Sequence, residues 1–207
     1  KDTLKLHEKS SSITAIRANR DGVVFGTSIG DLLYCENNSD KIISLPSISS
    51  IGIEESTIHS LAFTDENTLW VSIRNGGIYK LLIEEQRIEP LEGPINYNGQ
   101  EIRLESGIHG DLWIATEFQG LFCYTENEKS NFKCYDKFDG LNSQSIPLFI
   151  ELKCDKEGNI WAGTDGDGLF KISPETGKII VFQHEEINNS SISNNTITQI
   201  QEDSHGN

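Results

Sequence analysis

The chain has 207 residues, of which 36% are hydrophobic and 24% are charged, and its formal net charge is -15. This composition is typical of a globular protein that is long enough to bury a hydrophobic core. The acidic balance and the scattered Lys and Arg residues argue against a nucleic-acid partner, which needs a concentrated basic surface. No apolar segment is long enough to span a bilayer, so any membrane attachment would depend on segments outside these residues.

One pattern of small, aromatic and aliphatic residues occurs four times, first in a degenerate copy and then in three clearer ones. The copies are Asp21–Thr27, Asn67–Ile73, Gly110–Thr116 and Gly158–Thr164. A second apolar segment follows each of them, in order Leu32–Tyr34, Gly77–Leu81, Gly120–Tyr124 and Gly168–Ile172. Successive spacings of 46, 43 and 48 residues separate the equivalent positions Val24, Trp70, Trp113 and Trp161. Repeats of this length are typical of propellers and solenoids.

Each repeat divides into four short β segments joined by turn residues, as a four-stranded propeller blade requires. The second repeat contains Ile58–Phe63, Thr68–Ser72, Gly77–Leu81 and Arg87–Leu91. The fourth contains Phe149–Cys154, Asn159–Gly163, Gly168–Ile172 and Lys178–Gln183. We therefore predict an all-β propeller fragment whose four blades cover residues 13–48, 58–92, 101–138 and 149–183. Residues 197–207 match the lead-in to a further repeat and are predicted to begin a fifth blade with its first strand.

The sequence contains no methionine and stops inside this lead-in, so we expect a segment of a longer repeat array. Its blades would form an open arc of a seven-bladed propeller, with exposed blade faces that pack against another copy. The alternative is a closed ring of four blades in which Thr3–His7 pairs with a late strand.

Small residues stand two positions after the Val or Trp of each repeat and lie on the same face of that strand. They are Gly26, Ser72, Ala115 and Gly163. A large residue that alternates with a small one lets neighbouring blades interlock near the axis. We therefore expect these positions to mark the packing between blades.

Metal and redox signatures are weak. The four cysteines, Cys35, Cys123, Cys134 and Cys154, show no zinc-ligand spacing and are expected to be packing thiols, although Cys123 and Cys134 could also lie close together across a hairpin. The Asp165–Gly168 segment resembles the start of a calcium loop, but its twelfth position is Thr176 rather than an acid. We therefore expect neither a metal nor a cofactor.

Catalytic signatures are also missing from the sequence. The five histidines fall in different parts of different repeats, and there is no nucleophile motif. Asp165 and Asp167 could be imagined as a glycosidase acid and base, but paired carboxylates in a turn are usually solvated. We therefore expect that this chain is not an enzyme, although propellers do host hydrolases and lyases.

The shared consensus of these repeats is a Gly-Asn-Ile-Trp-Ala-Gly-Thr segment, a Gly-Leu-Phe segment and a Thr-Gly turn. It resembles the two-component regulator propeller repeat, most strongly over Phe149–Phe182. The resemblance implies the periplasmic sensor region of a hybrid two-component protein of Bacteroides-type bacteria. Such a sensor would bind an oligosaccharide released from a polysaccharide. It would signal as a homodimer to a histidine kinase outside this chain.

In a propeller the turns between second and third strands gather at one end of the blades. This places seven candidate ligand contacts together: Arg74, Asn75, Glu117, Phe118, Gln119, Asp165 and Asp167. A sugar needs an aromatic ring to stack on and polar side chains for its hydroxyls, which Phe118, Gln119 and Arg74 would supply. The alternative is that these are ordinary exposed turn residues.

Three functions stay open on these observations. The first is a ligand-sensing propeller, the second a structural scaffold that binds protein but no ligand, and the third a propeller lyase or hydrolase.

Overall fold

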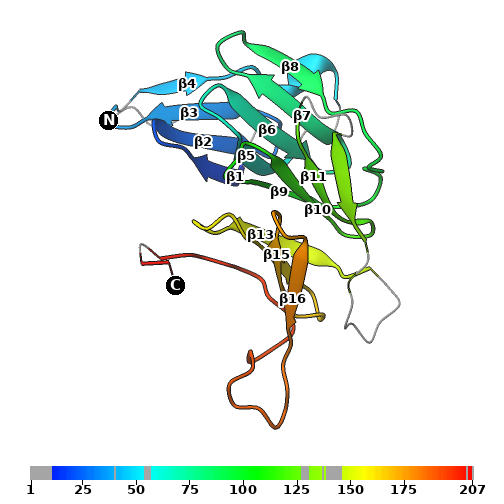
Figure 1. Ribbon diagram of the computed structural model, residues 1–207. Helices are drawn as coiled ribbons and strands as arrows, with labels where there is room; N and C mark the ends of the chain where they lie inside the picture. Colours follow the sequence, from blue (N-terminus) through cyan, green and yellow to red (C-terminus); the bar gives the residue numbers. More distant parts are fainter. Residues whose placement is uncertain are drawn as a thin grey trace. The chain divides into compact units, whose positions relative to one another are not determined.

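The computed structural model describes residues 11–39, 41–53, 57–126, 131–136, 138, 146–203 and 205–206. Within these ranges the chain forms sixteen β-strands and one short 3-10 helix, so the fold is all-β (Figure 1). Two compact units divide the chain, Lys1–Leu104 and Glu105–Asn207, and each is described separately. None of the described residues belongs to a helix long and apolar enough to cross a membrane. The predicted pairing of Thr3–His7 lies outside the described residues.

The first unit contains two four-stranded antiparallel sheets with their strands in sequence order (Figure 1). Blade 1 consists of β1 (Ile13–Ala18), β2 (Gly22–Thr27), β3 (Leu32–Glu36) and β4 (Ile42–Ser44), and the 3-10 helix η1 (Ile48–Ile51) follows it. Blade 2 consists of β5 (Ile58–Phe63), β6 (Thr68–Ile73), β7 (Gly77–Leu82) and β8 (Arg87–Pro90). The strands predicted for the second repeat agree with these bounds to within one residue.

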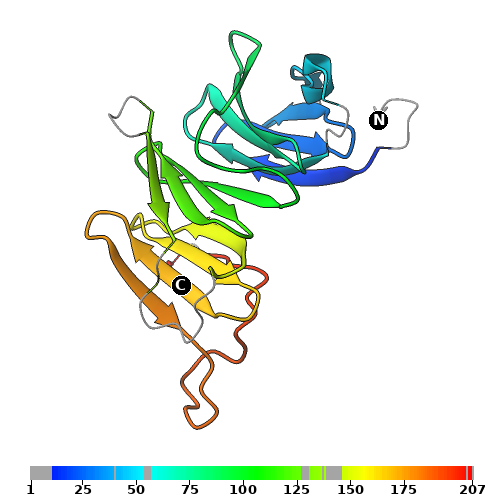
Figure 2. The same ribbon diagram turned by 90° about the vertical axis from the view of Figure 1, so that its right-hand side faces the viewer.

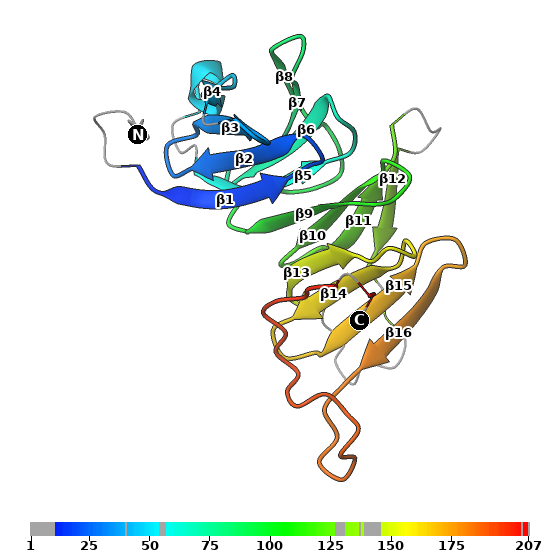
Figure 3. The same ribbon diagram turned by 90° about the vertical axis from the view of Figure 1, so that its left-hand side faces the viewer.

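Two further sheets of the same topology follow (Figures 2 and 3). Blade 3 consists of β9 (Ile102–Ser106), β10 (Leu112–Thr116), β11 (Gly120–Tyr124) and β12 (Phe132–Tyr135). Blade 4 consists of β13 (Phe149–Cys154), β14 (Ile160–Thr164), β15 (Leu169–Ser173) and β16 (Lys178–Phe182). Four antiparallel strands in sequence order form a propeller blade, so the predicted unit of the fold is confirmed.

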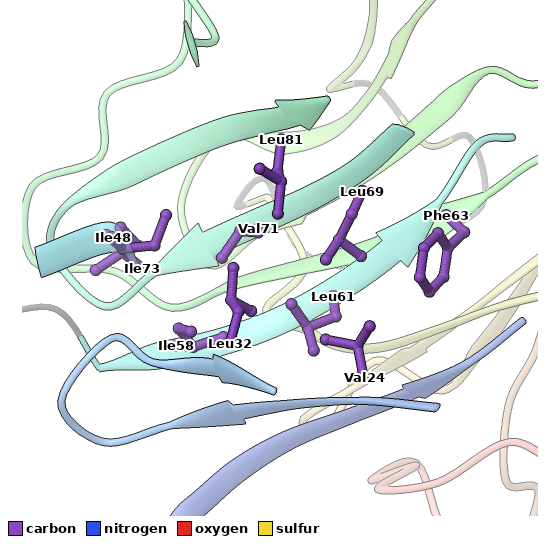
Figure 4. Close-up of a cluster of buried hydrophobic side chains, with 10 residues drawn as sticks. All are labelled: Val24, Leu32, Ile48, Ile58, Leu61, Phe63, Leu69, Val71, Ile73 and Leu81. Carbon is purple, nitrogen blue, oxygen red and sulfur yellow. The ribbon is translucent and has the colours of Figure 1, made fainter. Parts of the chain in front are cut away.

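The core of the first unit lies between its two sheets (Figure 4). Val24 and Leu32 of blade 1 and Ile48 of η1 pack against Ile58 and Leu61 on β5, with further apolar residues from β6 and β7. Val24, which stands where the other repeats have Trp, is fully buried. Burial of an aliphatic side chain of this kind stabilises the fold by about 1.5–3 kcal/mol.

Aromatic residues fill the core of the second unit. The rings of Phe138, Phe149 and Phe170 lie 5.1–5.4 Å apart, centroid to centroid, with inclined planes. Trp113 lies 5.3 Å from Tyr135 and is fully buried in the same cluster. Such inclined pairs add about 0.5–1.5 kcal/mol each beyond the area that they bury.

The small residues on the second strands do mark close approaches between a blade and the next inner strand. A methyl group built on Gly26 would lie 2.5 Å from Cγ2 of Ile58, and one on Gly163 would lie 2.6 Å from the Ile197 carbonyl oxygen. Ser72 uses its hydroxyl there, donating a hydrogen bond of 2.9 Å to the carbonyl of Ile102. The interlocking predicted from the alternation of large and small residues is therefore confirmed at these positions.

The segment after blade 4 differs from its prediction. Residues 197–207 are predicted to begin a fifth blade with its first strand, but the described residues among them, 197–203 and 205–206, adopt no strand conformation. Thr196 forms an isolated antiparallel bridge with Asp165, and the Ile197 amide donates to the Thr164 carbonyl at 2.9 Å. Figure 3 shows this orange-to-red segment leaving β16 as a long loop and returning beside the sheet. Ile197 therefore occupies the place next to Gly163 that Ile58 occupies next to Gly26, without forming a strand.

Candidate functional site

The turns between the second and third strands of blades 1, 2 and 4 are built in a common way. The amide of the first turn residue donates to the carbonyl of the residue before the inner strand, from Ser28 to Ser12, from Arg74 to Thr57 and from Asp165 to Leu148, at 2.9–3.0 Å. This bond ties each turn to the linker that enters its own blade. In blades 1, 2 and 4 the turn and the linker therefore lie at the same end of the blade.

A buried threonine closes three of these turns. The hydroxyl of Thr164 donates to the Gly168 carbonyl at 2.7 Å and accepts from the Asp167 amide at 3.0 Å. Thr116 makes the same pair of bonds with Gly120 and Gln119, and Thr27 accepts from the Asp31 amide. The threonine hydroxyl thereby holds the backbone of each of these turns.

Asp165 and Asp167 occupy the blade 4 turn as expected, but their surroundings are structural. Asp165 is exposed and accepts a hydrogen bond of 3.1 Å from the Thr196 hydroxyl. The Asp167 carbonyl accepts from Nε2 of Gln183 at 3.1 Å. Throughout the described ranges there is no group of three or more acidic, His or Cys residues that could hold a metal ion.

The blade 3 turn presents an aromatic ring to solvent. Phe118 is 63% exposed, which is unusual for a side chain of this size, whereas Glu117 and Gln119 on either side are half-buried. An exposed ring flanked by a carboxylate and an amide can stack on a flat apolar surface while its neighbours bind polar groups.

In the first unit, Arg74 belongs to a cluster that we call the Arg74 cluster, consisting of Arg74, Glu101 and His59. Nη2 of Arg74 donates to Oε1 of Glu101, and Nε2 of His59 lies 3.3 Å from Oε2 of the same carboxylate, without hydrogen-bond geometry. Asn75 follows Arg74 in a left-handed conformation, with φ of 59°. The cluster thus joins the blade 2 turn to β5 and to the residue before β9.

Burial above all, together with the positive charges of Arg103 and Arg74, lowers the pKa of His59 from 6.5 to about 4. His59 is therefore neutral at pH 7. Sequence inspection missed both His59 and Glu101. Both residues stand near the start of an inner strand, which lies at the same end of a blade as the turn that carries Arg74. This position in the repeat could have marked them as candidates.

The seven predicted contacts fall into two sets. Arg74 and Asn75 belong to the first unit, whereas the blade 3 and blade 4 turns carry the other five: Glu117, Phe118, Gln119, Asp165 and Asp167. In each set the residues lie on turns between the second and third strands of their blades. Their convergence around one axis stays a prediction.

The cysteines are free thiols within the described residues. Cys123 lies opposite Lys133 and Cys134 lies opposite Phe122, so the two thiols that could have paired point to opposite faces of the blade 3 sheet. Burial, with the nearby Asp111 carboxylate, raises the pKa of Cys123 to about 12. Cys123 therefore stays protonated and unreactive at neutral pH.

No family model matches the sequence, and no curated protein is similar to it in sequence. Solved structures resemble the fold closely. One is the extracellular domain of BT3049 from B. thetaiotaomicron, described as a hybrid two component system, with a TM-score of 0.69 and 18% identity. Another is the extracellular domain of BT4673 from the same bacterium, described as a one component system, with a TM-score of 0.69 and 22% identity.

The alignments with BT3049 and BT4673 cover 94% of this chain but only 24% and 25% of those chains. This chain therefore spans about a quarter of their length. A catalytically inactive variant of virginiamycin B lyase from Staphylococcus aureus, solved with quinupristin, also resembles it, with a TM-score of 0.66, 14% identity, and coverage of 88% of this chain and 59% of that one. The class of fold follows from these likenesses: the chain consists of β-propeller blades.

Proposed function

We propose that this chain is part of the extracytoplasmic sensor of a two-component signalling protein and recognises an oligosaccharide derived from a polysaccharide. The observation that carries the proposal is the likeness, over 94% of the chain, to the extracellular domains of BT3049 and BT4673. In this proposal the sensor lies in the periplasm and relays to a histidine kinase encoded outside these residues. The parent protein acts as a homodimer.

The turn chemistry supports a sugar as the ligand. Phe118 offers a stacking surface, and Arg74 offers guanidinium donors that Glu101 holds in place. A neutral His59 adds a ring nitrogen that can accept or donate according to its tautomer. Sugars combine apolar C–H faces with rings of hydroxyl groups, so the exposed ring of the second unit and the polar groups of the first unit each suit a sugar surface.

Substitutions on the exposed turns test this proposal. Phe118→Ala and Arg74→Ala are expected to weaken oligosaccharide binding about tenfold each, which corresponds to about 1.4 kcal/mol, without loss of stability. Calorimetric titration with a panel of neutral and acidic oligosaccharides measures the effect.

Matched controls come from elsewhere on the chain. Ile187 is 99% exposed, and Arg20 forms an exposed ion pair with Glu66 at 3.5 Å, so Ile187→Ala and Arg20→Ala remove similar groups without touching the turns. If the test and control variants lose the same amount of oligosaccharide affinity, the turns do not form the binding site. Intact signalling of the parent protein with both turn variants would favour the scaffold.

A lyase is the second candidate, and the His59–Glu101 contact favours it. A neutral histidine beside a carboxylate is suited to proton transfer, and virginiamycin B lyase has a similar fold. Turnover of a polysaccharide by the purified chain that disappears in His59→Ala would establish this function. Binding of an oligosaccharide without turnover would favour the sensor over the lyase.

A further inference from the structure

The turn at residues 203–206 is closed by the same hydrogen bonds as the turn at residues 155–158, which joins β13 to β14. In each turn the amide of the last glycine donates to the carbonyl of the first residue, at 3.1 Å and 2.9 Å respectively. Both glycines have a left-handed φ, 85° and 83°. The aspartate side chain that begins each turn also accepts the amide of the third residue, at 2.8 Å and 3.0 Å. Residues 197–202, which precede the turn, therefore stand where a blade has its first strand.

This segment also packs on blade 4 as blade 4 packs on blade 3. A methyl group built on Gly206 would meet the Lys156 side chain in the turn of blade 4, just as one on Gly158 would meet Ile108 in the turn of blade 3. At the other end of the segment Ile197 lies against Gly163. Both ends of residues 197–206 are thus placed like the first strand and first turn of a following blade.

The face of blade 4 beside this segment is more exposed than the equivalent face of blade 3. Phe182 on β16 is 38% exposed, whereas Tyr135, at the same place on β12, is 8% exposed. The second and third strands show the same difference, because their residues are fully buried on blade 3 and half-buried on blade 4. These equivalent pairs are Trp113 with Trp161 and Leu121 with Leu169.

The strands of blade 4 are what cover this face on blade 3. Ile160 and Ala162 on β14 lie in one apolar cluster with Trp113 and Leu121, together with residues of β15. The chain itself thus shows that a second strand, with aliphatic residues at alternate positions, fits this kind of surface.

At the corresponding place on blade 4 there is a cleft of about 420 Å³, which we call the blade 4 cleft. Trp161 and Leu169 line it from the sheet, and Ile200 and Glu202 line it from the segment at residues 197–202. No strand among the described residues pairs with residues 198–202. An unpaired strand edge beside an apolar surface is a template for a further strand.

We propose that the blade 4 cleft and residues 197–202 together bind an extended polypeptide strand with the pattern of β14, supplied by a neighbouring repeat of the parent protein. The strand lies antiparallel to residues 197–202, as β14 does to β13. Its backbone pairs with theirs and provides affinity, while alternate aliphatic side chains cover Trp161 and Leu169 and provide specificity. The inference rests on the proposed function only in that this chain is part of a larger protein.

A synthetic peptide that copies residues 158–173, added to the intact chain, tests this site. It is expected to bind with a dissociation constant below about 100 µM in calorimetric titration. In hydrogen-exchange mass spectrometry it should slow amide exchange at residues 198–202 at least tenfold. The same peptide with Ile160→Asp is the matched control and should bind at least tenfold more weakly, because its carboxylate would be buried against Trp161 without a partner.

A variant of the chain tests the face from the other side. Phe182→Ser removes an exposed ring from the face and should weaken peptide binding at least threefold. Ile187→Ser is its control, because Ile187 is 99% exposed and lies after β16 in the loop that leaves the blade, and it should leave binding unchanged.

The outcomes separate this inference from oligosaccharide sensing. Failure of the peptide to bind, equal binding of the Ile160→Asp peptide, or protection of β1 or β16 instead of residues 198–202 would overturn the strand site. None of these results bears on oligosaccharide binding, which is measured on the same chain without the peptide. Binding with protection confined to residues 197–206 and the cleft supports the inference, whether or not an oligosaccharide binds.

Discussion

The approach of Gly26 to Ile58 gives the sharpest stability prediction. A methyl group on Gly26 would lie 2.5 Å from Cγ2 and 2.9 Å from Cβ of Ile58. The Ile58 side chain is fully buried and branches at Cβ. Gly26→Ala should therefore force the two sheets apart locally and cost about 1–3 kcal/mol, as overpacking of a core does. Ile58→Ala alone should cost about 2–5 kcal/mol.

The double variant tests the cause. Ile58→Ala removes Cγ2 and leaves Cβ, so Gly26→Ala in that background should cost less than in the wild type, by about 0.5–3 kcal/mol of coupling. Urea unfolding followed by tryptophan fluorescence and circular dichroism measures the four proteins. Gly52→Ala serves as the control, because no atom lies within 4 Å of a methyl group there and only its left-handed φ of 82° is strained. If the losses in free energy of unfolding caused by Gly26→Ala and Ile58→Ala add to within about 0.3 kcal/mol in the double variant, the contact between Gly26 and Ile58 is not the cause of the destabilisation.

Three further predictions follow from the buried groups. Thr164→Val removes the hydroxyl that bonds Gly168 and Asp167 and should lower the free energy of unfolding by about 1–3 kcal/mol in urea titrations; no change would mean that the turn closes without it. His59 has a pKa of about 4 in the folded chain and 6.5 when unfolded, so stability should fall as pH drops from about 6.5 to about 4. This slope should be shallower in His59→Asn, and what remains at the acidic end comes from carboxyl groups such as Asp155 whose pKa is lowered. Exposed Cys134 should react with iodoacetamide at pH 8 before Cys123, whose pKa is raised to about 12; mass spectrometry that finds Cys123 labelled first would contradict its burial beside Asp111.

The blade structure could be predicted from the sequence because one physical requirement recurs. The Trp position and the small residue two places later indicate which face of a blade packs against the next inner segment. Gly26, Ser72 and Gly163 all lie in close contact with that segment. Alternation of apolar residues and turn chemistry then located the strands of blades 2 and 4 almost to the residue.

Periodicity reports burial but not the hydrogen-bond partner, which explains the error at residues 197–203. Ile197 is placed where its pattern indicates, next to Gly163, yet the described residues give it one backbone bond to Thr164 rather than a ladder. A strand is defined by its partner, and the pattern of a single segment carries no information about that partner.

The candidate sites depend on residues far apart in the sequence. Glu101, just before β9, contacts both Arg74 and His59 of β5, and no spacing rule connects these residues. Turn positions could be listed from the sequence, but contacts between turns could not.

Amide chemical shifts of the isotope-labelled chain, recorded while a binding oligosaccharide is added, test the central claim most directly. We predict shifts at the turns Arg74–Gly77 and Glu117–Gly120, while the Asn19–Gly22 turn between the first and second strands of blade 1 stays unchanged. An unchanged spectrum with every neutral and acidic oligosaccharide would contradict recognition by this propeller.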